Sequence, residues 1–317
     1  MIYENYQQML DIIGQYSAKK FTISVAAAAD QEVLTAIKRA NEIGLASAVL
    51  VGDKKSIQDM AKNLELDLEK TTVINEPDPV KASIEAVKQI KIGNANCLMK
   101  GLVNSSDFMS AVLDKEKGLR TGKMLSHLAA LDMPGFDRIL YVSDGGLNIS
   151  PTLEDKKKIM QNAIEYLIAM GYELPKVAVL SANEVVSPKQ QVTVDAAALK
   201  EMAEKGEITG AIVEGPVTLD MALDKEAAAH KKLSSKVAGE TDLLFAPTIE
   251  VGNILAKSMI YCGNGVMAGL ILGAQVPIIL TSRAATMEMK IASIAMAALP
   301  GAIASMESIK ERKLSFA

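Results

Sequence analysis

The stretch FTISVAAAADQEVLTAIKRANEIGLASAVLVG, residues 21–52, decides the fold class. It places two short apolar runs, 21–26 and 47–51, on either side of a segment, 31–43, whose apolar residues recur every three or four positions. Such runs are typical of strands buried on both faces, and the intervening spacing is typical of an amphipathic helix. The stretch therefore predicts two parallel strands joined by a crossover helix.

The same alternation continues to the end of the chain and predicts an α/β protein with a parallel sheet flanked by helices. Further strands are expected at 72–74, 95–99, 138–143, 176–180, 210–213, 242–245 and 277–281. Further helices are expected at 54–64, 79–92, 106–113, 153–170, 194–204, 219–233, 251–260 and 286–299. The turn-rich segment Asp144–Pro151 separates these elements, and we expect a second domain to begin after residue 150.

The charge and aromatic content of the chain argue against nucleic acid as a binding partner. The 317 residues carry 34 basic and 38 acidic side chains, a net charge of -4, and include 7 Tyr, 5 Phe and no Trp. A chain with so little net charge and so few aromatic residues is not expected to bind nucleic acid. The start shows no basic region followed by an apolar one, and the two cysteines, Cys97 and Cys262, lie far apart. These features favour the reducing cytoplasm.

The sequence does not support a membrane span, a nucleotide-binding P-loop or catalysis by histidine. No charged residue lies between Lys257 and Arg283, but glycines and a proline break this run, so we expect buried core rather than a membrane span. The segment from Gly118 to Met124 is one residue short of a phosphate-binding P-loop. The two histidines, His127 and His230, lie in segments expected to be helical and are interpreted as structural or solvated.

Three later segments carry more information: Val213-Glu-Gly-Pro-Val-Thr-Leu-Asp220, Ser235-Lys-Val-Ala-Gly-Glu-Thr-Asp242 continuing to Glu250-Val-Gly-Asn-Ile254, and Pro277-Ile-Ile-Leu-Thr-Ser-Arg283. In order and spacing they resemble the phosphate acetyltransferase and phosphate butyryltransferase family. The upstream segments 99–127 and 141–146 resemble the butyryl branch more than the acetyl branch. The resemblance covers roughly residues 90–300.

The resemblance implies a two-lobe α/β/α fold similar to isocitrate and isopropylmalate dehydrogenases, with the active site in the interlobe cleft. It implies that the last helix returns to the first lobe, which gives domains of 1–150 plus 282–317 and of 151–281. It also implies the reversible conversion of acyl-CoA and phosphate to acyl phosphate and CoA. No metal or cofactor is expected, since coenzyme A and phosphate are substrates.

That reaction needs a group for the phosphate, a group for the developing negative charge on the carbonyl oxygen, and a base for the CoA thiol. Arg283 offers a planar guanidinium for the first two, and Ser282 offers a hydroxyl. The alternative is a structural ion pair and a helix cap. The aspartate of the acetyl branch is replaced here by Met289, so its neighbour Glu288 is the candidate base, unless Glu288 is only solvated or CoA enters as thiolate.

Substrate-binding candidates lie elsewhere on predicted loops and strand ends. Lys100 ends a buried strand, where a charge is costly without water, a partner or a ligand. Arg120 lies on a glycine-flanked loop and is otherwise a surface residue. Asn148 and Thr152 lie on the loop expected between the lobes, where turn and cap chemistry explains them equally well. Asn253 belongs to the Glu250-Val-Gly-Asn-Ile254 part of the family pattern.

A phosphate acyltransferase that favours butyryl-CoA is thus predicted, with phosphate acetyltransferase as the close alternative. A metal-dependent dehydrogenase of similar fold would need clustered aspartates, which the sequence near Arg283 lacks. A non-catalytic CoA-binding relative is the third possibility. A homodimer or higher homo-oligomer is expected, with an apolar surface helix near Met296 suited to the contact.

Overall fold

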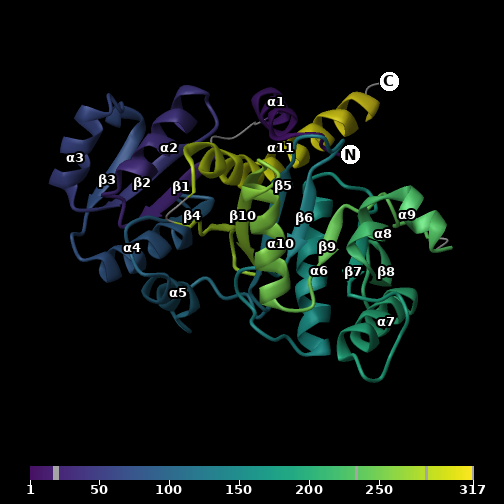
Figure 1. Cartoon of the computed structure of the whole chain (residues 1–317). Coiled ribbons are helices and arrows are strands. Elements are labelled where there is room, and N and C mark those ends of the chain that lie inside the picture. The colour runs from purple at the N-terminus through teal and green to yellow at the C-terminus, as the bar shows by residue number, and fades with distance from the viewer. Residues whose placement is uncertain (17–20, 233–234, 283–284, 316–317) are drawn as a thin grey trace. The chain divides into compact units, whose positions relative to one another are not determined.

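The computed structural model describes residues 1–16, 21–232, 235–282 and 285–315 (Figure 1). The chain folds into two compact units. The first unit comprises Tyr6–Lys123 and Ala268–Ala317, and the second comprises Met1–Asn5 and Met124–Met267. In each unit, helices pack against the strands of that unit, as the alternating pattern predicts.

The sheet of the first unit has the strand order β3-β2-β1-β4-β11-β10. Its pairings are parallel except for that of β10 with β11. The strands are β1 (Thr22–Ala26), β2 (Ser47–Gly52), β3 (Thr71–Asn75), β4 (Cys97–Lys100), β10 (Val266–Leu272) and β11 (Ile278–Ile279). The helices are α1 (Tyr6–Tyr16), α2 (Gln31–Glu42), α3 (Lys54–Asn63), the short 3-10 helix η1 (Leu68–Lys70), α4 (Pro79–Lys91), α5 (Ser105–Leu113) and α11 (Met287–Ser315).

The sheet of the second unit has the order β5-β6-β9-β7-β8, and it is parallel except between β5 and β6. Its strands are β5 (Ser126–Asp132), β6 (Leu140–Ser143), β7 (Lys176–Leu180), β8 (Ile212–Val217) and β9 (Leu243–Phe245). Its helices are α6 (Leu153–Ala169), α7 (Gln191–Glu204), α8 (Leu219–Leu223), α9 (Lys225–His230) and α10 (Ile249–Tyr261).

Local sequence explains where several helices begin. Asp30, Asp53 and Asp78 each stand just before a helix, and each side chain accepts a hydrogen bond from a backbone N–H of the first turn. Those N–H groups have no partner inside the helix, so an aspartate at the cap satisfies them. Pro79 then occupies the first turn of α4, where a missing N–H costs nothing.

The chain changes unit at 5/6, 123/124 and 267/268, whereas the sequence predicted domain boundaries at 150/151 and 281/282. The physical reason is strand pairing. β5 and β6 form a hairpin, and β6 pairs with β9, so both strands join the second unit ahead of the expected break. The turn-rich segment 144–151 is therefore a loop inside the second unit.

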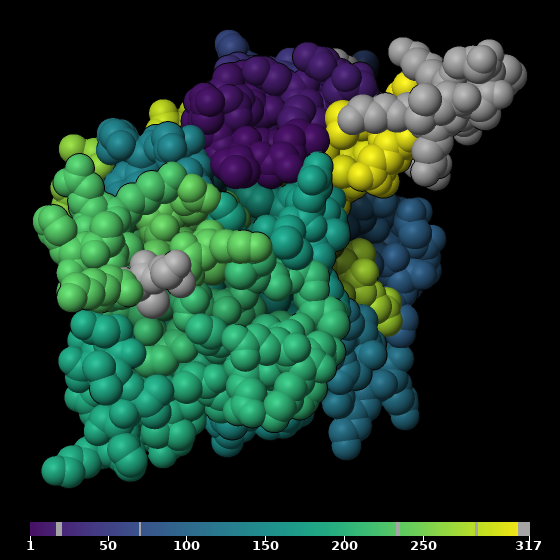
Figure 2. All heavy atoms as spheres, turned by 90° about the vertical axis from the view of Figure 1, so that its right-hand side faces the viewer, coloured from purple at the N-terminus to yellow at the C-terminus, as the bar shows by residue number. Residues whose placement is uncertain are grey.

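Helix α11 is longer and more buried than expected. It continues past Pro300 to Ser315 and packs beside α1, as Figures 1 and 2 both show at the yellow and purple ends of the chain. Met296 is fully buried, so the expected oligomer-forming surface near that residue is wrong. In the described part of the chain, Met287–Ile309 is the one helix long and apolar enough to cross a membrane, and 67% of its most apolar window is buried within the protein.

Candidate active site

The loop that follows β6 is organised around one buried carboxylate. Asp144 is 3% exposed, and its Oδ1 accepts hydrogen bonds from the N–H groups of Gly146 and Leu147 at 2.8 and 2.9 Å. Its Oδ2 accepts from the His127 N–H at 2.9 Å and from Asn148 Nδ2 at 2.6 Å. Four N–H donors thus compensate the buried charge and fix the course of the loop.

Two of the predicted substrate-binding residues meet at this loop. Asn148 Nδ2 also donates to the Leu125 carbonyl at 3.0 Å, and Asn253 Nδ2 on α10 donates to the Gly145 carbonyl at 2.9 Å. A Cβ at Gly252 would lie 2.4 Å from the Asp144 carbonyl oxygen, so this approach of helix to loop requires glycine. The Glu-x-Gly-Asn-Ile pattern therefore serves to seat α10 against the loop.

Thr152 is placed at the other end of the same loop, where it caps α6. Its Oγ1 accepts from the Asp155 N–H at 3.2 Å, and the Asp155 carboxylate accepts from the Thr152 N–H at 3.1 Å. This reciprocal pair is a capping box. The cap chemistry that the sequence allowed for Thr152 is present, and no hydrogen bond links Thr152 to Asn148 or Asn253 among the described residues.

His127 lies in strand β5, which corrects the expectation of a helix. Its ring packs against Gly146, and its Nδ1 is buried without a hydrogen-bond partner in the described part of the chain. Burial lowers the pKa of His127 below its usual range, against the opposing attraction of Asp144. The sequence predicted a structural or solvated role for His127, and it did not predict that the ring packs against the candidate loop at Gly146.

In the first unit, the structure brings Lys100 and Ser282 to one sheet edge. Lys100 is the last residue of β4, and Ser282 follows β11, which pairs with β4 in parallel. Lys100 is half-buried, and its Nζ donates to the carbonyls of Gly101 and Val103 at 3.1 Å each. Ligands of parallel α/β sheets bind at this carboxyl edge.

The structure does not place the remaining candidate residues of the first unit beside Lys100 and Ser282. Arg283 lies outside the described residues. Glu288 is exposed in the first turn of α11, and the neighbouring Met289 is half-buried. Arg120 forms a β-bridge with Ala274, in the turn between β10 and β11. That turn precedes β11, so the structure does not bring Arg120 to the carboxyl edge occupied by Lys100 and Ser282.

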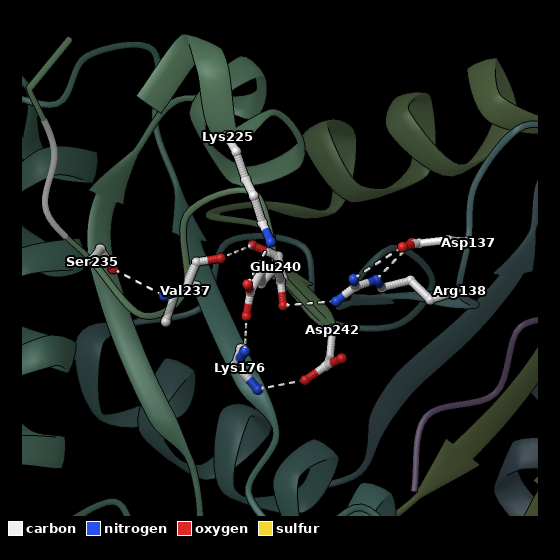
Figure 3. Close-up of polar contacts among 9 residues, drawn as sticks. Asp137, Arg138, Lys176, Lys225, Ser235, Val237, Glu240 and Asp242 are labelled. Atoms are coloured by element: carbon white, nitrogen blue, oxygen red, sulfur yellow. Dashed lines mark hydrogen bonds and ion pairs between the residues drawn. The ribbon is translucent and has the colours of Figure 1, made fainter. Parts of the chain in front are cut away.

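Part of the family-like pattern lies at the opposite, amino edge of the second sheet (Figure 3). Glu240 binds Lys225 Nζ at 2.6 Å and also pairs with Lys176, and these contacts hold the pKa of Glu240 at about 2. The Arg138 guanidinium binds Asp137 and, at 3.2 Å, the Glu240 carbonyl oxygen. The charges here neutralise one another, so this part of the pattern holds the fold together.

Asp242, the last residue of that segment, is as buried as Asp144, with 3% exposure. Its Oδ2 accepts from the Lys176 N–H at 2.8 Å, but its Oδ1 has no hydrogen-bond partner within the described ranges. Burial raises the pKa of Asp242 above its usual value, against the attraction of Arg138 and Lys176. Across residues 1–16, 21–232, 235–282 and 285–315, no three His, Cys, Asp or Glu side chains gather as a metal site.

Comparison with known proteins identifies the family of this chain. The pattern of the family described as phosphate acetyl/butaryl transferase matches residues 8–83 and 78–298. A phosphate butyryltransferase of Clostridium beijerinckii is 43% identical over 94% of this chain and 98% of its own length. A branched-chain phosphotransacylase of Enterococcus faecalis V583 superimposes with a TM-score of 0.80 at 31% identity, covering 89% of this chain and 99% of that one.

A more distant structure supports the fold alone. The 4-hydroxythreonine-4-phosphate dehydrogenase of Klebsiella pneumoniae superimposes with a TM-score of 0.57 at 15% identity, over 89% of this chain and 100% of that one. The expected dehydrogenase-like α/β fold is confirmed. From the matched family pattern and the extent of identity, this chain belongs to the phosphate acetyl/butaryl transferase family.

Proposed function

We propose that this protein is a phosphate acyltransferase that converts acyl-CoA and phosphate to acyl phosphate and CoA, with butyryl-CoA favoured over acetyl-CoA. The observation that carries the proposal is the 43% identity to a phosphate butyryltransferase over nearly the whole length of both chains. Relatives named phosphate acetyltransferase, such as that of Rhizobium meliloti at 42% identity over 87% of this chain, keep the acetyl group as the second candidate.

In the proposed reaction a phosphate oxygen attacks the thioester carbonyl, the carbon–sulfur bond breaks, and CoA leaves as thiolate or thiol. Arg283 and Ser282 bind the phosphate and stabilise the charge on the carbonyl oxygen, because the guanidinium and hydroxyl both donate hydrogen bonds. Lys100 adds a positive charge at the sheet edge where Ser282 also lies. Glu288 exchanges the thiol proton in the reverse direction. Chemistry of this kind needs no metal.

The loop held by Asp144 supplies amide groups from the second unit. Asn148 and Asn253 are fixed there by hydrogen bonds of 2.6 to 3.0 Å, so they are preorganised. We propose that this loop contacts the substrate. Arg120 and Thr152 remain proposed substrate contacts that rest on the family resemblance. A cytoplasmic homo-oligomer also remains part of the proposal, and size-exclusion chromatography with light scattering tests the oligomeric state.

The test is release of free thiol from butyryl-CoA, followed with a thiol reagent, with and without phosphate. We expect release that requires phosphate and is unchanged by EDTA. Acetyl-CoA serves as the matched substrate and should react more slowly. Thiol release without phosphate would identify a hydrolase instead, and loss of activity on chelation would contradict the metal-free mechanism.

A further inference from the structure

An apolar pocket of about 460 Å³ opens at the carboxyl edge of the second sheet. Leu180 closes β7 at its wall, Leu219 follows β8, Pro247 follows β9, Val192 comes from the start of α7, and Val251 and Leu255 come from α10. Every one of these residues is described, and the lining contains no charged side chain. A cavity of this size matches a small-molecule site rather than a packing defect.

The polar groups in the lining are already engaged with the loop that they belong to. Ser181 Oγ accepts from the Asn183 N–H at 3.2 Å, and Gln190 Oε1 accepts from Asn183 Nδ2 at 2.6 Å. Thr193 Oγ1 donates to the Gln190 carbonyl at 2.8 Å. Because these groups bind one another, the pocket presents hydrocarbon to its occupant. An anion or a sugar would find few free donors there.

Two of the lining residues keep a large share of their apolar side-chain surface exposed. Val251 is 41% exposed and Leu219 is 38% exposed, although both lie at a concave site. Removing this surface from water would release hydrophobic free energy in proportion to the apolar area covered. The pocket is therefore suited to a ligand with an alkyl segment.

Helix α10 connects this pocket to the candidate substrate loop. Val251 and Leu255 lie one helical turn apart and face the pocket, while Asn253 between them binds the Gly145 carbonyl at 2.9 Å. The Ile249 N–H at the start of the helix donates to the Ile149 carbonyl at 3.1 Å. A ligand in the pocket would thus lie against the same helix that fixes the loop bearing Asn148.

We propose that this pocket binds the acyl chain of the thioester substrate and sets the preference for chain length, with Val251 as a specificity-determining residue. The inference rests on the proposed function and deepens it. Relatives of this chain are named for acetyl, butyryl and branched-chain groups, so the family pattern leaves the acyl group open. A pocket larger than a four-carbon chain predicts that hexanoyl-CoA also binds.

The experiment compares kcat/KM for acetyl-, butyryl- and hexanoyl-CoA in the wild type and in Val251→Phe. Each buried methylene should raise kcat/KM about fourfold, so butyryl-CoA, with two more methylenes than acetyl-CoA, should exceed it about 16-fold in the wild type. Phenylalanine is larger than valine and narrows the pocket at this wall, so we expect the butyryl preference to fall to near one while acetyl-CoA is little affected. Ile254→Phe is the matched control, because Ile254 lies on the same helix, is 65% exposed and does not line the pocket.

Binding measured by calorimetry separates this inference from the proposed function. The wild type should bind butyryl-CoA more tightly than CoA, and Val251→Phe should bind the two equally. If the protein releases no thiol from any acyl-CoA but keeps this difference in binding, the proposed reaction fails and the pocket assignment stands. Equal binding of butyryl-CoA and CoA by the wild type would overturn the assignment.

Val251→Ala tests the same residue with a smaller side chain, in case Val251→Phe does not fold. It removes methyl groups from the pocket wall, and we expect the butyryl preference to fall about threefold at an unchanged melting temperature. A butyryl preference that stays within twofold of the wild type in both Val251 variants would overturn the inference. An equal shift in the Ile254→Phe control, or an equal loss for every chain length, would do the same.

Discussion

Asp144 and Asp242 are equally buried, yet they lie at opposite edges of the second sheet and differ in their surroundings. Asp144, after β6, receives four N–H hydrogen bonds, whereas Asp242, before β9, receives one and has a pKa raised by burial. The carboxyl-edge loop is thus built around a charge. At the amino edge, the Asp242 carboxylate accepts a hydrogen bond only from the Lys176 N–H among the described residues, so little of the local structure depends on it.

The same contrast divides the family-like pattern. Glu250–Ile254 seats α10 at the carboxyl edge, while Glu240 and its lysine partners lie at the amino edge. Resemblance to a family therefore identifies residues that maintain the fold as readily as residues that bind substrate. Substitutions at matched positions on the two edges can separate these roles.

The largest effect is expected for Asp144→Ala. It leaves four N–H donors without an acceptor, including those of Gly146 and Leu147, and should lower the free energy of unfolding by about 3 kcal/mol. Urea denaturation measures this change. The kcat of the remaining folded protein should also fall, because Asn148 loses one of its two hydrogen-bond partners. A variant as stable as the wild type would show that the loop does not depend on this charge.

The next largest effect is expected for Arg283→Lys, which keeps the charge but loses the planar guanidinium. We expect kcat to fall about 10²-fold, as when one oxyanion donor is removed. The control at the amino edge is Arg138→Lys, which weakens contacts with Asp137 and should leave kcat within twofold. Steady-state kinetics with butyryl-CoA measures both variants. Equal losses of kcat would contradict the proposal that Arg283 acts in catalysis and Arg138 only in maintaining the fold.

Glu288→Gln should slow the conversion of acyl phosphate to acyl-CoA about tenfold at pH 7. The loss should shrink as the pH approaches the thiol pKa of about 8.5, where CoA ionises without a base. Met289→Asp is the converse test, because it restores the aspartate of the acetyl branch. If Met289→Asp accelerates the reaction while Glu288→Gln has no effect, Glu288 is not the base.

A smaller effect, on stability alone, is expected for Glu240→Gln. The lysine contacts lower the pKa of Glu240 from 4.5 to about 2, so they stabilise the fold fully above pH 4.5 and are lost as the pH falls through 2. Because Glu240 is partly exposed, we expect a loss of about 1 kcal/mol at pH 7 and less at pH 3. Glu201→Gln, from an exposed pair with Lys205, is the control and should change little.

The smallest effect is expected for Asp242→Asn. Because burial raises the pKa of Asp242, the wild type should lose stability from this group as the pH rises from 3.8 through the folded-state pKa. The amide removes that dependence, so the variant should be as stable as the wild type at pH 7, within about 0.5 kcal/mol, or more stable. Thermal unfolding at pH 4 and pH 7 measures the difference, and a marked destabilisation would show that the charge is required.

The sequence by itself determined the α/β class, most of the elements and the family. Apolar runs such as 47–51 and helical spacing such as 31–43 are local signals, because burial on one or both faces fixes the repeat of side chains. It missed strands β5 and β10 and the helix α1. His127 was placed in a helix for the same reason, since a short apolar run such as 126–132 fits either structure until its strand partner is known.

Only the tertiary structure decided which residues share a site. Strand order brought Lys100 and Ser282 to one edge and set Arg120 apart, because parallel pairing of β4 with β11 aligns their carboxyl ends while the turn at Ala274 precedes β11. It also buried Met296 in the core, and it assembled the apolar pocket from the carboxyl ends of β7 and β9 and from helices α7, α8 and α10. Contacts between residues distant in the chain depend on pairing and packing, which no local repeat in the sequence specifies.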